Sequence, residues 1–374
     1  MPSIANIIGT DMSTYKLIKK NQFAYGPVTS RNGDKISIAL LEKHENALLS
    51  QAYTVFEVID ENELYPEYLM MWFKRPEFDR YARFMSHGSA REIFSWAEMC
   101  DTLLPIPSPE KQLEIVKEYK VIKNRIKLNN QLIAKLEETA QAIYKQWFVD
   151  FEFPDENGLP YKSSGGEMVK SELGEIPKGW LISKLSQIVD SQYGYTASAD
   201  FFVEGPKFLR ITDISNDAVN WNSVPNCEID KRDFDKYSLE EGDIVIARTG
   251  ATVGSAKQIN KLSPLAVFAS YLVRLKIKDK RLFRYVGLSV VSQGYKDYIL
   301  NVAGGSAQPQ ANAVLMTDYN IILPLEDVIN KLNVIVNSIF DLQEILQVEN
   351  SKTLILKELI LAKMTKVEME EDFY

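Results

Sequence analysis

The sequence predicts an α/β (α+β) protein in which two globular units alternate with two long helices. Three observations lead to this prediction. One segment recurs 217 residues later in the chain, a heptad pattern follows each copy, and short β-branched and aromatic runs precede each copy. The predicted order is globular unit, long helix, linker, globular unit, long helix.

The recurring segment shows an internal repeat. Residues 88–107, GSAREIFSWAEMCDTLLPIP, and residues 305–324, GSAQPQANAVLMTDYNIILP, are identical at six of twenty positions without a gap. Background composition would give roughly one identity. Three further pairs share the offset of 217: Arg31 and Arg248, Gly33 and Gly250, Tyr81 and Tyr298. Two related units of this kind predict a pseudo-twofold arrangement.

The two globular units are expected at 1–107 and 174–325. Short runs rich in β-branched and aromatic residues predict strands at 50–59, 243–247 and 268–277. Shorter helical segments are predicted at 66–85 and 281–300.

The long helices are expected at 108–150 and 326–366, with an acidic tail at 367–374. Neither Pro nor Gly interrupts 110–148, and Ser108 and Pro109 suit a helix start. Apolar residues at alternating steps of four and three give each helix one apolar stripe, here called the seam. The seams predict an antiparallel coiled coil. Their main residues are Ile115, Ile122, Ile126, Ile133, Leu136, Leu332, Ile339, Leu346 and Leu356.

Two segments break this regular pattern. Asn129 falls on the seam, where it would either fix the helix register at some cost in stability or face solvent through a local shift of the heptad phase. Both alternatives are open from the sequence. Residues 151–173 are rich in Pro, Gly, Ser and charges, which predicts a linker.

Composition excludes several kinds of chemistry. Cys100 and Cys227 are the only cysteines and His44 and His87 the only histidines, so neither a metal site nor a Ser-His-Asp site is expected. The segment GATVGSAK, 250–257, fails the spacing of a phosphate-binding loop. There is no long apolar run and no basic region before an apolar N-terminal stretch, so we expect a cytoplasmic protein without membrane contact.

Charge is unevenly distributed along the chain. The net charge is −8, but residues 248–284 contain nine basic residues and one acid, Asp279, a local charge of +8. Such a run indicates either a polyanion-binding surface or a solvated strand face.

Nucleic-acid binding accounts best for the remaining features. Two half-sites on B-DNA lie about 34 Å apart, a separation that long helices match in scale. Arg31, Asn32 and Lys35, with Arg248 and Lys257 opposite them in the repeat, suit phosphates or guanine edges, and glutamine amides suit adenine. The full set of candidate DNA-binding residues is Arg31, Asn32, Lys35, His87, Arg91, Tyr193, Tyr195, Arg210, Arg248, Lys257, Gln308 and Gln310.

Five stretches resemble the specificity (S) subunit of type I restriction–modification systems, the HsdS family. They are LGEIPKGW (173–180), PIPSPEKQLEIV (105–116), QWFVDFEFP (146–154), ARTGATVGSAK (247–257) and LPLED (323–327). Together with the repeat, the resemblance covers nearly the whole chain.

The resemblance implies a non-catalytic subunit of a site-specific endonuclease and adenine-N6 methyltransferase complex. Each globular unit would be a target-recognition domain that reads one half of a split sequence in double-stranded DNA, and the coiled coil would set the spacer. Two methyltransferase (M) subunits would carry S-adenosylmethionine. Two restriction–translocase (R) subunits would use ATP and Mg. No cofactor or metal is expected in this chain.

The chain departs from that pattern in its first unit. At offset 217 Met1 aligns with Ala218, so about forty residues of the second unit, from Gly174 onward, have no counterpart. Either the chain starts late or its first unit is built differently. Two other interpretations are open: a truncated or silent copy that keeps partner binding without full DNA specificity, and a coiled-coil scaffold without nucleic-acid binding.

Overall fold

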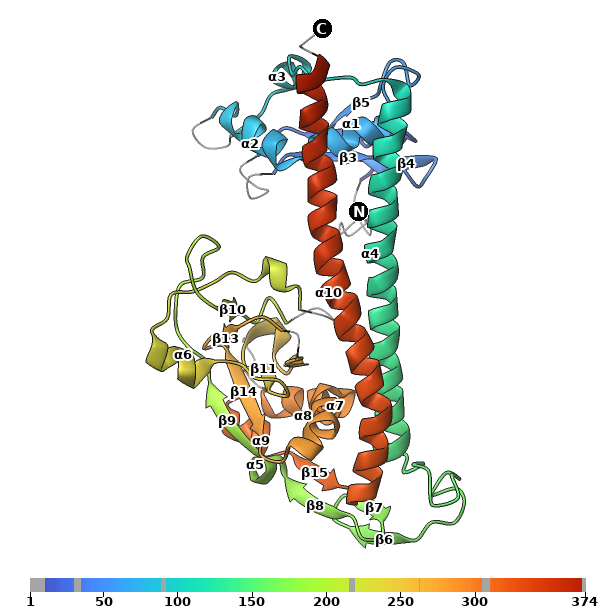
Figure 1. Ribbon diagram of the computed structural model, residues 1–374, viewed down its shortest axis with the longest axis vertical. Helices are drawn as coiled ribbons and strands as arrows, with labels where there is room; N and C mark the ends of the chain where they lie inside the picture. The colour runs from blue at the N-terminus through green and yellow to red at the C-terminus, as the bar shows by residue number, and fades with distance from the viewer. Residues whose placement is uncertain are drawn as a thin grey trace. The chain divides into compact units, whose positions relative to one another are not determined.

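The protein forms two compact units, each a mixture of helices and strands (Figure 1). The computed structural model describes residues 11–29, 35–88, 92–214, 219–261, 263–304 and 310–371. Unit 1 comprises 1–127 and 352–374, and unit 2 comprises 128–351. These units do not follow the six predicted segments, because each long helix contributes to both of them.

Unit 1 has a central antiparallel sheet in the order β3-β2-β5 and a separate pair, β1 and β4. The core contains Phe23 and Tyr25 of the central strand, and the first helix packs Tyr68 and Trp72 onto them. The elements are β1 (Lys16–Lys19), β2 (Phe23–Gly26), β3 (Ser37–Leu40), β4 (Asn46–Leu49), β5 (Thr54–Phe56), α1 (Pro66–Phe73), α2 (Pro76–Phe84) and α3 (Trp96–Cys100).

Unit 2 is built on a four-stranded antiparallel sheet in the order β12-β11-β14-β9. All four residues of β11 are buried, as expected for a central strand covered on both faces. The strands are β6 (Met168–Ser171), β7 (Gly174–Pro177), β8 (Leu181–Lys184), β9 (Val189–Tyr193), β10 (Lys207–Leu209), β11 (Ile244–Ala247), β12 (Ala256–Gln258), β13 (Ala266–Phe268), β14 (Leu272–Ile277) and β15 (Asn320–Leu323).

The short helices of unit 2 are α5 (Leu185–Ile188), η2 (Trp221–Ser223), α6 (Lys231–Tyr237), η3 (Gly250–Thr252), η4 (Lys280–Leu282), α7 (Phe283–Val291), α8 (Gln293–Val302) and α9 (Ala313–Thr317). The predicted helical segments 66–85 and 281–300 are therefore each divided in two. Pro76 starts α2, where its missing N–H costs nothing, and Ser292 caps α8 by accepting a hydrogen bond from the Tyr295 N–H.

The two long helices are α4 (Pro109–Tyr144), which ends in a π turn, η1 (Lys145–Val149), and α10 (Glu326–Glu371). Within unit 2 they lie side by side and antiparallel. The Asn129 side chain is 3% exposed and donates to Glu349 at 3.1 Å and to Asn350 at 3.0 Å. Gln343 donates to the Ile133 carbonyl oxygen. Asn129 thus faces the partner helix, which decides between the two alternatives left open by the sequence.

Burial follows most of the predicted seam. Ile115, Ile133, Leu332 and Leu346 are buried, and Ile122, Ile126, Leu136 and Ile339 are half-buried. In unit 1, α4 residues Ile115, Val116 and Tyr119 share a core with α10 residues Ile360, Leu361 and Met364.

The prediction for Leu356 is wrong, because its side chain is 52% exposed while Thr353 and Ile360 are buried. The inner face of α10 runs through Asn350 and the partly buried Lys357. Asn350 takes an inner position because it accepts a hydrogen bond from Asn129. A seam assigned from apolar residues alone is therefore shifted by one residue in this part of α10.

Four successive helices begin 217 residues apart in the two units. The starting pairs are Pro66 and Phe283, Pro76 and Gln293, Trp96 and Ala313, Pro109 and Glu326. The sheets correspond as well, since β2 lies between β3 and β5 as β11 lies between β12 and β14.

The predicted linker is not an open connection. Phe151 and Phe153 are buried in the core of unit 2, where both rings contact Trp180 at centroid distances of 5.8 and 5.0 Å. Residues 168–171 pair with 174–177 as a hairpin. The aromatic residues in this polar segment anchor the chain where the first long helix ends. None of the helices in the described ranges is long and apolar enough to cross a membrane.

Candidate functional site

The candidate site lies at one end of the four-stranded sheet of unit 2, where β9 and β11 end and β14 begins. Arg248 follows the last residue of β11, and Tyr193 is the last residue of β9. The guanidinium carbon of Arg248 lies 4.7 Å from the centre of the Tyr193 ring. The Tyr193 hydroxyl oxygen accepts a hydrogen bond from the Ala313 N–H at 3.0 Å. Tyr193 is therefore a fixed platform under a cation.

Backbone hydrogen bonds hold the loop that carries Arg248. Its N–H donates to the Tyr271 carbonyl at 3.0 Å, and its carbonyl accepts from the Ala311 N–H at 2.9 Å. The next residue, Thr249, forms an isolated antiparallel bridge with Gln310. Three of the predicted residues, Tyr193, Arg248 and Gln310, are thus brought together from distant parts of the chain.

Unlike four other cations of the basic run, Arg248 has no carboxylate partner among the described residues. It forms no ion pair with any described carboxylate, and its buried Nε has no hydrogen-bond partner among the described residues. Among the described residues its side chain donates one hydrogen bond, a long one of 3.5 Å from Nη1 to the Ser270 carbonyl. A charged group on an apolar ring with an unused donor is suited to accept an anionic ligand.

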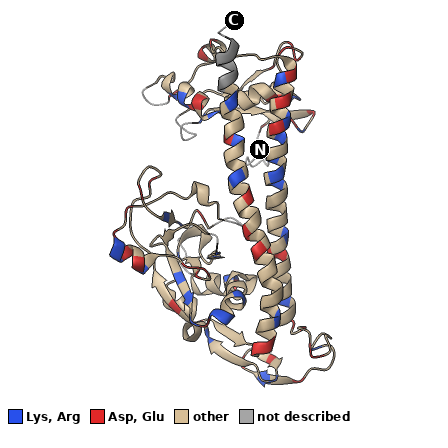
Figure 2. Cartoon of the chain, viewed as in Figure 1, with Lys and Arg blue, Asp and Glu red and all other residues tan. Residues whose placement is uncertain are grey.

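Half of the other eight cations in the basic run pair with acids, so the predicted basic surface is smaller than its charge of +8 suggested. Figure 2 shows acidic and basic residues interspersed on unit 2. Four cations of the run pair with acids: Arg274 with Asp243, Lys276 with Glu240, Lys278 with Asp190, and Arg281 with Asp279 and Glu326. Most of these acids lie outside the run, which explains why the run alone was misleading.

Among these ion pairs, Arg274–Asp243 is the buried one. Burial raises the pKa of Asp243 above its ordinary value, and the nearby Arg274 opposes this rise only in part. The Arg274 guanidinium also donates to the Ser238 carbonyl at 2.7 Å. Arg274 therefore holds the sheet together and is not available to a ligand.

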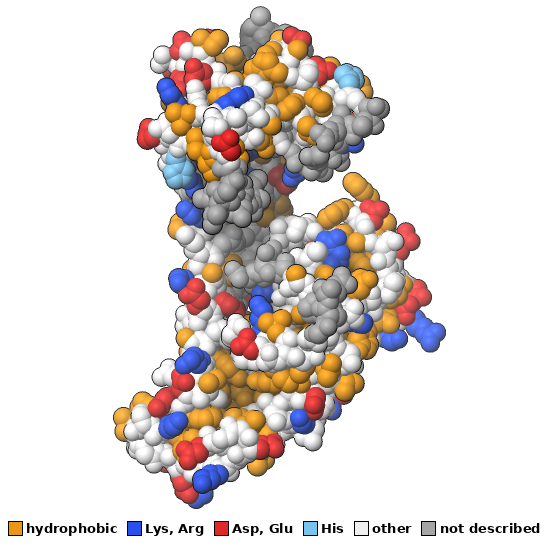
Figure 3. Space-filling view, turned by 180° about the vertical axis from the view of Figure 1, so that it is seen from behind, with side chains coloured by type: hydrophobic (Ala, Val, Ile, Leu, Met, Phe, Trp, Pro, Cys, Tyr) orange, Lys and Arg blue, Asp and Glu red, His pale blue; other side chains and the backbone are white. Residues whose placement is uncertain are grey.

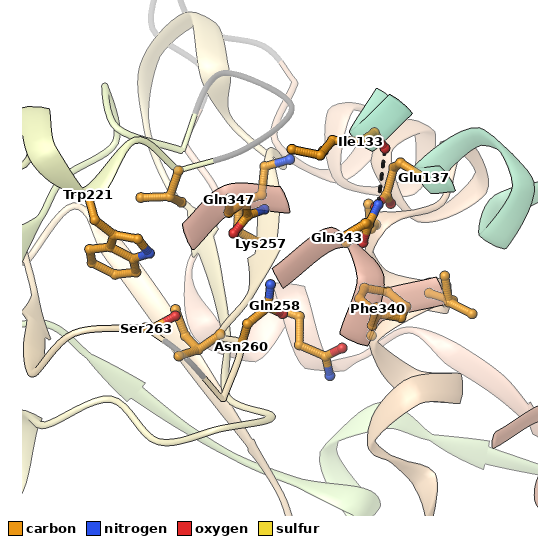
Figure 4. Close-up of a pocket in the computed structure, with 15 residues that line it drawn as sticks. Ile133, Glu137, Trp221, Lys257, Gln258, Asn260, Ser263, Phe340, Gln343 and Gln347 are labelled. Carbon is orange, nitrogen blue, oxygen red and sulfur yellow. Dashed lines mark hydrogen bonds between the residues drawn. The ribbon is translucent and has the colours of Figure 1, made fainter. Parts of the chain in front are cut away.

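Lys257, which the sequence nominated for DNA binding together with Arg248, lies in β12. It lines a cavity of about 60 Å³ together with Gln258, Gln343 and Gln347 (Figure 4). A water molecule occupies roughly 30 Å³ of liquid, so this polar space suits a few waters and no larger ligand. Because β12 and the long helices form its walls, Lys257 belongs to the internal packing of unit 2.

The other predicted residues are dispersed. Tyr195 packs against Tyr237 at a centroid distance of 5.3 Å, and Arg210 pairs with Asp213 at 3.0 Å. In unit 1, Lys35 is exposed and His87 lies 3.3 Å from Glu98. Arg31, Asn32, Arg91 and Gln308 lie outside the described residues. In the described ranges, no three His, Cys, Asp or Glu side chains are grouped to hold a metal ion.

Tyr271 is a member of the site that sequence reasoning missed. Its side chain is exposed, and its carbonyl holds the Arg248 backbone. The sequence assigned it to the interior of one strand, 268–277, whereas the structure ends β13 at Phe268 and starts β14 at Leu272. The apolar pattern of 268–277 is continuous, so the sequence did not show the break between β13 and β14 at which Tyr271 is exposed.

In unit 1 the described residues at the corresponding place, Pro27, Val28 and Ile93, are apolar. The Phe94 N–H donates to the Pro27 carbonyl as the Ala311 N–H donates to that of Arg248, and Val28 bridges Ile93 as Thr249 bridges Gln310. Since Phe94 and Ala311 are 217 apart, Pro27 takes the place of Arg248. Arg31, the predicted counterpart of Arg248, lies outside the described residues, so its equivalence with Arg248 stays a prediction.

Comparison with known proteins shows what the chain is similar to. Residues 6–138 match the family model for the type I restriction modification DNA specificity domain. The chain is 21% identical to the HindI specificity subunit of Haemophilus influenzae, over 98% of this chain and 90% of that protein. It is 24% identical to the MjaIX specificity subunit of Methanocaldococcus jannaschii, over 76% of this chain but only 64% of that protein.

A solved structure supports the same fold. The S subunit of a type I restriction–modification system from M. genitalium matches 93% of this chain and 84% of that chain, with a TM-score of 0.50 and 12% identity. The resemblance to type I specificity subunits that the sequence indicated is thereby confirmed.

Proposed function

We propose that the chain is the DNA sequence-recognition subunit of a type I restriction–modification complex, and that unit 2 contacts DNA through Tyr193, Arg248 and Gln310. The observation that carries this proposal is the Arg248 guanidinium, which lies on the Tyr193 ring without a carboxylate partner among the described residues. An arginine of this kind binds phosphate or the O6 and N7 atoms of guanine.

The backbone beside Arg248 supports the same proposal. Gly250 has a φ of +76°, and a side chain added there would meet no atom within 4 Å. The backbone is therefore accessible at this turn, and a phosphate could approach its N–H groups closely. Gln310, bridged to Thr249, offers the amide that pairs with adenine.

The proposed complex assigns the chemistry to other subunits. M subunits would supply S-adenosylmethionine and adenine methylation, and R subunits would supply ATP- and Mg-dependent restriction. This chain would dock both and bind a bipartite target, with one half-site for each unit. The paired helices and the 217-residue spacing of the helix starts support a coiled coil and a pseudo-twofold internal repeat.

One observation favours a second candidate function for part of the chain. Unit 1 carries Pro27 and Ile93 where unit 2 carries Arg248 and Gln310. A subunit that keeps the fold and partner binding, but reads only the half-site of unit 2, fits this difference.

Salt dependence of DNA binding tests the proposal. Phosphate contacts release counterions from DNA, so the logarithm of the binding constant falls linearly with the logarithm of the salt concentration. Each phosphate contact that is lost reduces this slope by about 1. We expect Arg248→Gln to reduce both the affinity and this slope, measured by fluorescence anisotropy from about 50 to 200 mM salt. Arg281→Gln, which removes an exposed cation already paired with Asp279 and Glu326, is the matched control and should change the slope less.

Two results would overturn the proposal. If the chain, purified with its methyltransferase partner, binds duplex DNA without salt dependence, the phosphate contacts do not exist. If Arg248→Gln and Arg281→Gln have the same slope as the unchanged chain, unit 2 does not use the proposed cluster.

A further inference from the structure

Three lysines of unit 1 occupy positions at which unit 2 is apolar. Lys74 follows the last residue of α1, Lys123 lies in α4 and Lys357 lies in α10. At the offset of 217 residues, their counterparts in unit 2 are Val291, Phe340 and Ala140. All three counterparts are part of the main core of unit 2 or pack against it, and the first two also line its cavity. Unit 1 therefore has charged side chains where unit 2 has packed apolar ones.

The fold of unit 1 brings these three lysines together. Helices α4 and α10 lie side by side and antiparallel, with Tyr119 and Ile360 in one core (Figure 1). Lys123 and Lys357 lie about one turn beyond these two residues in the same direction, so they are level with each other. Lys74 ends α1, the helix that packs onto the same core. Burial and the like charges of Lys123 and Lys357 lower the pKa of Lys74, as expected for neighbouring ammonium groups.

One carboxylate accompanies the three lysines. Glu42 lies two residues after β3, as Asn260, which lines the cavity of unit 2, lies two residues after β12. The Glu42 Oε2 atom is 3.7 Å from the Lys123 Nζ atom. Lys74 and Lys357 form no ion pair with a described carboxylate of unit 1. Three ammonium groups and one carboxylate leave this cluster with a charge of +2.

Roles in the fold account for only part of this cluster. Lys74 lies at the C-terminal end of α1, where a cation is favourable, and Lys123 has Glu42. Neither reason applies to Lys357, which is partly buried on the inner face of α10. On the face shown in Figure 3, by contrast, Lys and Arg side chains are interspersed with acidic ones. Like charges held close together destabilise one another, and an anion bound between them relieves the repulsion.

We propose that Lys74, Lys123 and Lys357 form a binding site in unit 1 for a phosphate group. Lysine ammonium groups bind phosphate as point charges. Lys74 and Lys123 are exposed, so a ligand in solution can reach them. The phosphate belongs either to the backbone of DNA or to a small phosphorylated molecule. Phosphate binding at this site is independent of the proposed function, whereas DNA as its source rests on that function.

Inorganic phosphate is the probe, and broadening of its phosphorus NMR line by the full chain measures binding. The chain carries Arg248→Gln, so that the cluster proposed in unit 2 does not contribute. We expect Lys357→Met, which removes one charged contact, to weaken phosphate binding about tenfold. Lys74→Met should act in the same direction. Lys178→Met, which removes an exposed lysine of unit 2 paired with Glu167, is the matched control and should have no effect.

The stability of the chain without phosphate separates a binding site from a role in the fold. Lys357→Met keeps an unbranched side chain at this partly buried position and removes one of three like charges. The urea concentration at the midpoint of unfolding should therefore be unchanged or higher. A lysine that the fold requires would give a lower midpoint when it is replaced.

Duplex DNA identifies the source of the phosphate. If DNA displaces inorganic phosphate, and Lys357→Met makes the salt dependence of DNA binding shallower, the phosphate belongs to the DNA backbone. If inorganic phosphate stays bound in the presence of DNA, the ligand is a small phosphorylated molecule. A chain that binds phosphate but no DNA would contradict the proposed function and retain this site.

The phosphate site is refuted if the Arg248→Gln chain leaves the phosphorus line of phosphate unchanged. It is also refuted if Lys357→Met and Lys74→Met bind phosphate as tightly as Lys178→Met does. A lower unfolding midpoint of Lys357→Met without phosphate would assign that lysine to the fold and would likewise contradict the proposal.

Discussion

Arg248 and Arg274 show how a side chain's surroundings decide its role. Both belong to the same basic run, and each guanidinium lies near an aromatic ring. Arg274 faces the buried Asp243, and both of its Nη atoms donate to backbone carbonyls, although its Nε, like that of Arg248, has no described partner. Arg248 has a ring beneath it and a buried Nε without a described partner. The first is a structural residue, and the second is suited to a ligand.

The two cysteines give a prediction at the same scale. Cys227 is buried, and burial raises the pKa of its thiol to about 11, whereas Cys100 is exposed. At pH 8 we expect Ellman's reagent to modify one thiol in the native chain and two after unfolding. Two fast-reacting thiols in the native chain would contradict the burial of Cys227.

The raised pKa of Cys227 also makes the free energy of unfolding depend on pH. The folded chain keeps the Cys227 proton up to about pH 11, but the unfolded chain loses it near the ordinary value of 9.0. Proton loss therefore favours the unfolded state, and the free energy of unfolding falls as pH rises between these values. Cys227→Ser should lack this part of the decline.

Residue identity alone gave a list of candidate site residues, but it could not show which of them come together in the fold. Tyr193, Arg248 and Gln310 were all candidates from the sequence, together with nine others. The sequence could not show that Arg210 pairs with Asp213 or that Lys257 lines a cavity, because long-range partners are set by the fold.

At the scale of elements, Asn129 connects the two long helices. It is buried and donates two hydrogen bonds, to Glu349 and Asn350. Asn129→Ala removes both donated hydrogen bonds and leaves two partly buried acceptors, so we expect a loss of about 1–3 kcal/mol in the free energy of unfolding. Asn130→Ala removes an exposed acceptor of the neighbouring bond and should cost less. Urea unfolding followed by circular dichroism measures both, and equal losses would contradict the buried placement.

Trp180 tests the segment that the sequence described as a linker. Its ring contacts Phe148, Phe151 and Phe153 and is buried. Trp180→Ala should destabilise unit 2 by about 3–5 kcal/mol, because it removes a large aromatic side chain from a core. The adjacent Leu181 is 67% exposed, so Leu181→Ala should change stability by less than about 0.5 kcal/mol. Thermal unfolding that ranks the two variants equally would show that the aromatic cluster does not anchor unit 2.

The elements also show what periodicity can predict. Both long helices were predicted because heptad spacing and the absence of Pro and Gly are local signals, and their starts agree with the structure within one residue. The phase of the seam at Leu356 was not predictable, because it depends on a polar contact between Asn129 and Asn350. The packed aromatic residues of 151–173 were missed because the surrounding composition is that of a loop.

At the scale of the whole molecule, the internal repeat is preserved in the helices and lost at the site. Helix starts keep the 217-residue spacing, but Pro27 replaces Arg248 and no described strand of unit 1 corresponds to β9. The repeat was visible in the sequence because it lies in core and helix positions. The difference between the units was only partly visible, since insertions near β2 shift the alignment and are detected only through hydrogen-bond register.

The most direct test of the central claim is a map of methylated adenine made by this chain together with the methyltransferase subunit of its own system. We predict methylation at a defined DNA sequence, and we predict that Arg248→Gln weakens or relaxes recognition in the half read by unit 2 while Arg281→Gln does not. Methylation without a common sequence, or an identical motif and extent with Arg248→Gln, would contradict the assignment of DNA recognition to this end of the sheet.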